Sequence, residues 1–126
     1  MEDLEKYIES KKENKIRTMP FIDYLYFLMK EKNLESTDIY NKVDIDRRVW
    51  SKIISNKMKP SLNMVVKIAF GLRCNNEECK LLLKKLNYTL SSSSEFSLVI
   101  RYCIENEIYN IIDVNNLLYE KGLSLL

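Results

Sequence analysis

The apolar residues of the chain recur at intervals of three and four positions, the spacing that places side chains on one face of an α-helix. The first clear run contains Phe21, Tyr24, Leu25 and Leu28. It predicts a helix that begins after Pro20 and extends to about residue 32, before Asn33. Similar runs follow at short intervals, so the pattern indicates several short helices with tight connections.

Six further apolar runs each follow residues that are suited to begin a helix. The expected caps are, in chain order, Ser36 or Thr37, Asp46, Ser61 after Pro60, Asn75 or Asn76, Ser92 in a capping box with Glu95, and Asn110. Asn56 and Gly122 are expected to end two of these helices, because both residue types tolerate the left-handed backbone conformation. We find no convincing strand pattern, so the sequence predicts an all-α protein.

The chain divides into three expected parts, 1–17, 18–90 and 91–126. Residues 1–17 hold five acids and five bases, with Leu4, Tyr7 and Ile8 at helical spacing. They form either a short amphipathic arm or helix, or a frayed, solvated terminus. Residues 91–126 are expected to be a helical extension packed on the middle part, where they complete the core or form a dimer or partner face.

The composition narrows the chemistry that the chain can perform. Among 126 residues there are only two Gly and two Pro, too few for a many-stranded fold, and no His, the commonest general base and metal ligand. Cys74, Cys79 and Cys103 cannot complete a tetrahedral zinc site alone. We therefore expect no enzyme activity, no metal and no cofactor. The sequence has no apolar signal core or membrane span, and we expect a cytoplasmic protein without membrane contact.

Charge is distributed unevenly along the chain, although the net charge is only +2. Residues 42–85 contain eleven bases and four acids, a local charge of +7, and the segments on both sides are neutral or acidic. Several of these bases lie on or just after the helix expected over residues 47–54. Such a cluster is what a phosphate backbone attracts, although a solvated basic face is the plainer interpretation.

The segment Trp50–Leu62, WSKIISNKMKPSL, resembles the Xre-type, phage-repressor-like helix-turn-helix family, as does the helix after it with Val65, Val66, Ala69 and Leu72. This resemblance implies a five-helix domain over Phe21–Leu86. Residues 86–118 look like the tail of small, largely uncharacterised bacterial helix-turn-helix proteins. Together these resemblances imply a small transcriptional regulator that binds double-stranded DNA. They also imply a homodimer, because a dimer contacts two half-sites and so gains specificity.

The resemblance also implies positions for the DNA contacts. In that family the third helix lies in the major groove, and the N-terminus of the second helix meets phosphate. By position, the groove contacts would be Arg47, Arg48, Ser51 and Lys52, and the backbone contacts would be Ser36, Thr37, Asn56, Lys57 and Lys59. Arg47 and Arg48 are the first candidates for base contact, because Arg pairs with guanine through two hydrogen bonds.

Three positions depart from the family pattern. Tyr40 and Trp50 replace small residues, and Asp44 replaces a turn glycine. These departures predict that the two helices are spaced or angled differently from those of a standard DNA reader, and Asp46 adds a carboxylate at the end that would approach phosphate. They support an alternative function, in which the same scaffold serves as a protein-interaction adaptor or antitoxin-like partner. RNA binding is a lesser alternative.

Overall fold

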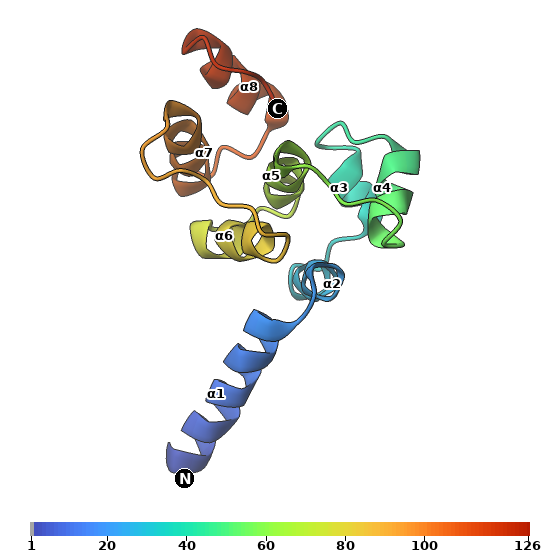
Figure 1. Cartoon of the computed structure of the whole chain (residues 1–126), viewed down its shortest axis with the longest axis vertical. Helices are drawn as coiled ribbons and strands as arrows, with labels where there is room; N and C mark the ends of the chain where they lie inside the picture. The colour runs from blue at the N-terminus through green and yellow to red at the C-terminus, as the bar shows by residue number, and fades with distance from the viewer. Residues whose placement is uncertain (1) are drawn as a thin grey trace.

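The computed structural model describes residues 2–126, and every regular element in that range is helical (Figure 1). The elements are α1 (Glu2–Thr18), α2 (Phe21–Glu31), α3 (Ser36–Tyr40), α4 (Arg47–Ile54), α5 (Leu62–Gly71), α6 (Asn76–Lys84), α7 (Glu95–Glu105) and α8 (Ile111–Glu120). The all-α prediction is confirmed for this range. None of these helices is both long and apolar enough to cross a lipid bilayer.

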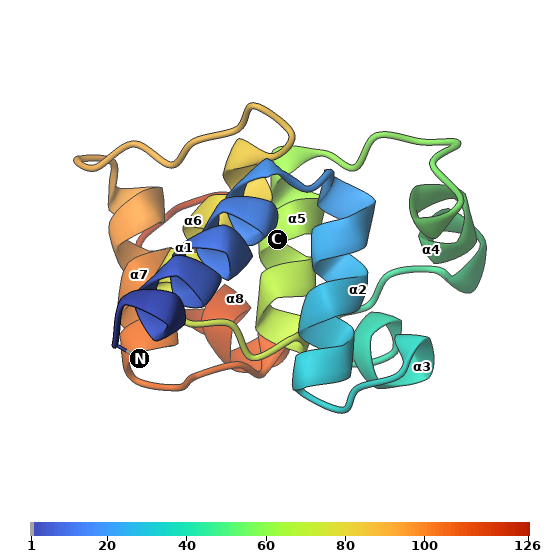
Figure 2. The same ribbon diagram turned by 90° about the horizontal axis from the view of Figure 1, so that it is seen from below.

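Helix α5 occupies the centre of the core, with α2, α3 and α4 on one side and α6, α7 and α8 on the other (Figures 1 and 2). Its side chains Val65, Val66, Ile68 and Phe70 are all buried. At its end, Gly71 lets α3 approach closely, because a Cβ atom there would lie 2.9 Å from Ile39 Cγ2. The central helix therefore connects the predicted helix-turn-helix pair to the C-terminal helices.

Most of the helix boundaries follow the predicted caps. The side chains of Asp46, Ser61, Asn75 and Asn110 each accept a hydrogen bond from a backbone N–H in the first turn of α4, α5, α6 and α8. Left-handed φ angles occur at the expected stops, which are Asn33 (54°), Asn56 (61°) and Gly122 (68°), and at Asp44 in the turn (56°). These predictions are confirmed. They could be made from the sequence because each cap and stop depends on the chemistry of nearby residues.

Two predicted caps are wrong. Glu35, not Ser36 or Thr37, is the N-cap of α3, because its N–H donates to the Asp38 carboxylate at 2.8 Å and the helix starts one residue earlier. Ser92 and Glu95 do not form the predicted capping box. Within the serine run, Ser94 caps α7 instead, since its hydroxyl lies 3.1 Å from the N–H and 2.8 Å from the hydroxyl of the buried Ser97.

The N-terminal segment is a helix, as one of its two interpretations predicted. Figure 1 shows α1 projecting away from the other helices, with its N-terminus at the far end. Its opposite end is held by Lys85, whose ammonium group donates to the backbone carbonyls of Ile16 (2.7 Å), Arg17 (3.0 Å) and Met19 (2.7 Å). A cation is favourable at a helix C-terminus, where carbonyl groups lack intrahelical partners. Lys85, together with Ile16 and Met19 packed against the core, thus anchors the projecting helix.

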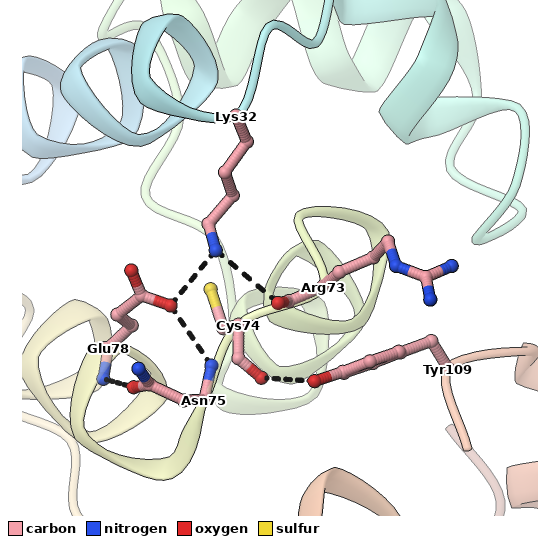
Figure 3. A network of polar contacts seen from close by, with 6 residues as sticks. All are labelled: Lys32, Arg73, Cys74, Asn75, Glu78 and Tyr109. Carbon is pink, nitrogen blue, oxygen red and sulfur yellow. Dashed lines mark hydrogen bonds and ion pairs between the residues drawn. The ribbon is translucent and has the colours of Figure 1, made fainter. Parts of the chain in front are cut away.

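The C-terminal helices share the core of the rest of the chain, through buried residues such as Ile100, Cys103 and Leu118. The Tyr109 hydroxyl, in the connection between α7 and α8, donates to the Cys74 carbonyl at 3.0 Å (Figure 3). The Arg73 guanidinium carbon lies 5.0 Å from the centre of the same ring. This connection is therefore fixed to the turn between α5 and α6.

Polar contacts also join the end of α2 to the turn between α5 and α6. The Lys32 ammonium lies 3.0 Å from Glu78 Oε1, and that oxygen also accepts the Asn75 N–H at 3.0 Å (Figure 3). The Asn75 side chain in turn accepts the Glu78 N–H at 2.8 Å. The capping box of α6 and the only ion pair of the described residues are thus one network, which holds α2 against α6.

Candidate nucleic-acid interface

Helix α4 presents one buried and one basic face. Trp50 and Ile53 are buried in the core, whereas Arg47, Arg48, Ser51 and Lys52 are all exposed. The chain folds this way because the apolar and polar residues of RRVWSKII alternate at helical spacing. The four residues predicted to contact the DNA groove therefore share the outer side of one helix.

The five residues predicted to contact the DNA backbone lie in two places. Ser36, which is half-buried, and Thr37, which is exposed, occupy the first turn of α3. Asn56, Lys57 and Lys59 are exposed in the segment between α4 and α5. All three of these loop residues follow α4 directly, so its basic face continues into a basic loop.

Backbone hydrogen bonds give the basic loop a fixed conformation. The N–H groups of Lys57 and Met58 both donate to the Lys52 carbonyl, at 2.8 and 3.2 Å, and this closes the C-terminus of α4. The left-handed φ of Asn56 makes these bonds possible. Loops held in this way lose less conformational entropy when a ligand binds.

Tyr88, which lies beyond the C-terminus of α6, supports the same loop. Its hydroxyl donates to the Pro60 carbonyl at 2.9 Å, and the Lys59 ammonium lies 4.8 Å from the centre of its ring. Sequence reasoning did not find this role for Tyr88, because no spacing rule connects residue 88 with residue 60. The cation–π contact orients Lys59 but leaves it exposed.

Asp46 places a carboxylate at the N-terminus of α4, next to the two arginines. Its Oδ1 atom accepts the Arg48 N–H at 2.7 Å. The cap stabilises α4, but its negative charge opposes the approach of phosphate at this end. The electrostatic attraction for a nucleic acid must therefore come from the exposed Arg and Lys side chains.

The two large aromatic residues that depart from the family pattern contact each other. The Tyr40 ring of α3 lies beside the Trp50 ring of α4, and Trp50 is only 2% exposed. Trp50 Nε1 is buried and has no hydrogen-bond partner among the described residues. The pair fills the space between α3 and α4.

A groove of about 760 Å³ lies beside the basic loop, between that loop and the start of α2. Lys57, Lys59 and Lys85 line it, but so does Asp23, and Lys85 is already engaged with the end of α1. The groove thus lacks a dedicated anion site. Among residues 3–126, no cluster of three Cys, Asp or Glu side chains could hold a metal ion.

The buried thiols carry no reactive character. Burial raises the pKa of Cys79 to about 11, and it raises the pKa of Cys74 and Cys103 as well. Each of these groups stays protonated at neutral pH, because the low-dielectric interior disfavours a thiolate. They act as small apolar side chains of the core.

Comparison with known proteins finds no family model, curated protein or solved structure that matches this chain.

Proposed function

We propose that this protein binds double-stranded DNA in a sequence-specific manner and acts as a small transcriptional regulator. The observation that carries the proposal is the outer side of α4, where Arg47, Arg48, Ser51 and Lys52 are all exposed on a helix whose other side is fixed in the core. A helix of this kind can enter the major groove and present Arg side chains to guanine.

The basic loop supports the same proposal. Its conformation is fixed by hydrogen bonds, and it continues from the C-terminus of α4 with Lys57 and Lys59 exposed. Lysines in such a position would contact phosphate and set the register of the helix on the duplex. In this division of roles, Arg47 and Arg48 provide specificity, and the loop provides affinity that depends on salt.

Selection from a random pool of duplex DNA at fixed salt tests the proposal, followed by titration of the selected site. Arg47→Ala or Arg48→Ala should cost about 1–3 kcal/mol and relax specificity at one base pair. Lys57→Ala should weaken binding to all sequences about equally and reduce the salt dependence. Lys121→Ala, an exposed lysine outside the proposed interface, is the control.

Two results would contradict the proposal. One is the absence of any enriched DNA sequence. The other is binding that is independent of salt and equal in the wild type and both Arg variants. Parallel selection from an RNA pool separates RNA binding from DNA binding, because RNA-specific recognition would enrich single-stranded loops instead.

A second candidate function is a protein-interaction module built on the same scaffold. It is favoured by the large apolar side chains that α7 and α8 leave exposed, which are Leu98, Tyr102, Ile112 and Tyr119. Exposed apolar side chains mark a protein-interaction surface where they gather in one patch. A stoichiometric partner that co-purifies after nuclease treatment and is lost in a Tyr102→Glu, Tyr119→Glu variant would support this function over DNA binding.

A further inference from the structure

Tyr88 lies in the turn that ends α6, and backbone hydrogen bonds fix this turn. The Tyr88 N–H donates to the Leu83 carbonyl at 2.9 Å. The Asn87 N–H donates to the Lys84 carbonyl at 2.9 Å, and Asn87 has a left-handed φ of 63°. This combination is a Schellman motif, which closes the C-terminus of a helix. The turn therefore holds the Tyr88 backbone in a fixed position relative to α6.

The Tyr88 side chain reaches from this turn to the end of the basic loop. Its hydroxyl donates to the carbonyl of the buried Pro60 at 2.9 Å. Proline has no N–H, so the carbonyl is the only backbone group of that residue that can form a hydrogen bond. The next residue, Ser61, caps α5 by accepting the Met64 N–H. The end of the loop is thus fixed both to the turn after α6 and to the start of α5.

The Tyr88 ring also contacts one of the two lysines of the basic loop. The Lys59 ammonium lies 4.8 Å from the centre of the ring, and Lys59 is exposed. The face of an aromatic ring is negative, so it attracts an ammonium group. Lys57 is exposed as well, and its backbone N–H, rather than its side chain, ties it to α4. Lys59 is therefore the loop lysine whose charged group is held by a ring.

An ammonium group held in this way is prepared for contact with an anion. Lysine has a long, flexible side chain, and fixing it on binding costs conformational entropy. The ring contact of Lys59 lowers this cost, because it restricts the side chain before the anion arrives. The ammonium has three N–H donors, so its side away from the ring stays available. Lys59 should therefore contribute more to anion binding than a lysine that moves freely.

We propose that Tyr88 is a positioning residue for DNA binding, whose ring holds the Lys59 ammonium in place for contact with a DNA phosphate. The inference rests on the proposed function and deepens it. Tyr88 lies beyond Phe21–Leu86, the span that the resemblance gives to the five-helix domain. The surface that contacts DNA is thus completed by a residue outside that span.

The test measures binding of the full chain to a duplex of arbitrary sequence, about 20 base pairs long, at low salt, where phosphate contacts dominate. Tyr88→Phe and Tyr88→Leu both lack the hydroxyl, so their comparison isolates the ring. Tyr88→Leu should bind about two- to fivefold more weakly than Tyr88→Phe, the range that an exposed cation–π contact gives. The salt dependence should be the same for both, because both keep every positive charge.

Lysine variants show whether the ring acts through Lys59. In a Lys59→Ala background, Tyr88→Phe and Tyr88→Leu should bind equally, because the ring then has no ammonium to hold. In a Lys57→Ala background, which is the matched control, the difference between them should remain. Each of the two Lys→Ala changes should itself reduce the salt slope by about one. A general effect on the fold would instead appear in both backgrounds.

NMR spectra of the free protein test the contact without DNA. In the wild type, the ring current of Tyr88 should shift the ε-methylene protons of Lys59 upfield relative to those of Lys57. Tyr88→Phe should keep this shift, and Tyr88→Leu should lose it. Circular dichroism checks that each variant is folded, and the shift in the wild type stays decisive if Tyr88→Leu does not fold.

The failure of this inference differs from the failure of the proposed function. A wild type that binds neither the arbitrary duplex nor a selected one overturns both. If the wild type binds DNA, equal affinities of Tyr88→Phe and Tyr88→Leu overturn the role of Tyr88 alone. An undiminished difference between these variants in the Lys59→Ala background does the same, as does the absence of the ring-current shift in the wild type.

Discussion

The aromatic rings of Tyr40 and Trp50 lie 6.1 Å apart between their centres, with their planes tilted by 36°, where α3 meets α4. An edge or tilted arrangement at this distance is favourable for two aromatic rings. The pair therefore sets the separation of the two helices that carry the candidate nucleic-acid interface.

Substitution of Trp50 should separate the contribution of its ring from that of its N–H group. Trp50→Phe keeps an aromatic ring beside Tyr40 and removes the unpaired Nε1, so it should cost no more than about 1.5 kcal/mol. Trp50→Ala should cost about 3–5 kcal/mol. Urea unfolding followed by circular dichroism measures both, because this sole tryptophan cannot serve as the fluorescent reporter. Equal losses would show that the packing of the ring depends on the whole indole.

Substitution of Asp46 should separate helix capping from charge. Asp46→Ala should lower the free energy of unfolding by about 1 kcal/mol, since the Arg48 N–H loses its partner. Asp46→Ser keeps a capping oxygen and should unfold as the wild type does. If the proposed function holds, both variants bind DNA more tightly than the wild type, because a carboxylate near phosphate is gone. Unfolding and DNA titrations on the same preparations check both points, and unchanged affinity would place Asp46 outside the contact.

Removal of the Lys85 ammonium should release α1. Lys85→Met leaves the carbonyls of Ile16, Arg17 and Met19 without their donor, so amide exchange in α1 should become faster. Lys84→Met, at the adjacent exposed position, is the matched control and should leave the exchange rates near those of the wild type. Hydrogen exchange with mass spectrometry at low protein concentration measures the difference. Equal protection of α1 in both variants would show that other contacts hold the helix.

Alkaline pH should destabilise the fold through its buried thiols. The pKa of Cys79 is raised from 9.0 to about 11 by burial. Its contribution to stability is full below pH 9, where the thiol is protonated in both states. It declines between pH 9 and 11, because only the unfolded chain then ionises. Urea unfolding from pH 8 to 11 should show a steeper decline for the wild type than for Cys79→Ala. Parallel declines would mean that other groups control the alkaline limit.

Helix positions could be predicted from the sequence where capping is local. Asp46, Ser61 and Asn110 each bond within the turn that they begin, so nearby residues determine the boundary. Prediction failed where several candidates stood side by side. In the serine run, the choice of Ser94 depends on the burial of Ser97, which is a property of the folded core.

The candidate interface could be predicted only in part. Exposure of Arg47 and Lys52 follows from the helical spacing around buried Trp50 and Ile53. The support that Tyr88 gives to the basic loop could not be predicted, because that contact joins residues 28 positions apart. Helical periodicity reports which face is buried but not which distant residue covers it.

The anchor of α1 has a consequence for the order of events during synthesis. Lys85 lies 66 to 69 residues after the carbonyls that it binds, so α1 leaves the ribosome long before its anchor has been made. Until then, the acidic, apolar first half of this helix is a free segment on the nascent chain. The end of this helix gains its three Lys85 contacts only after the segment that follows α6 has been made.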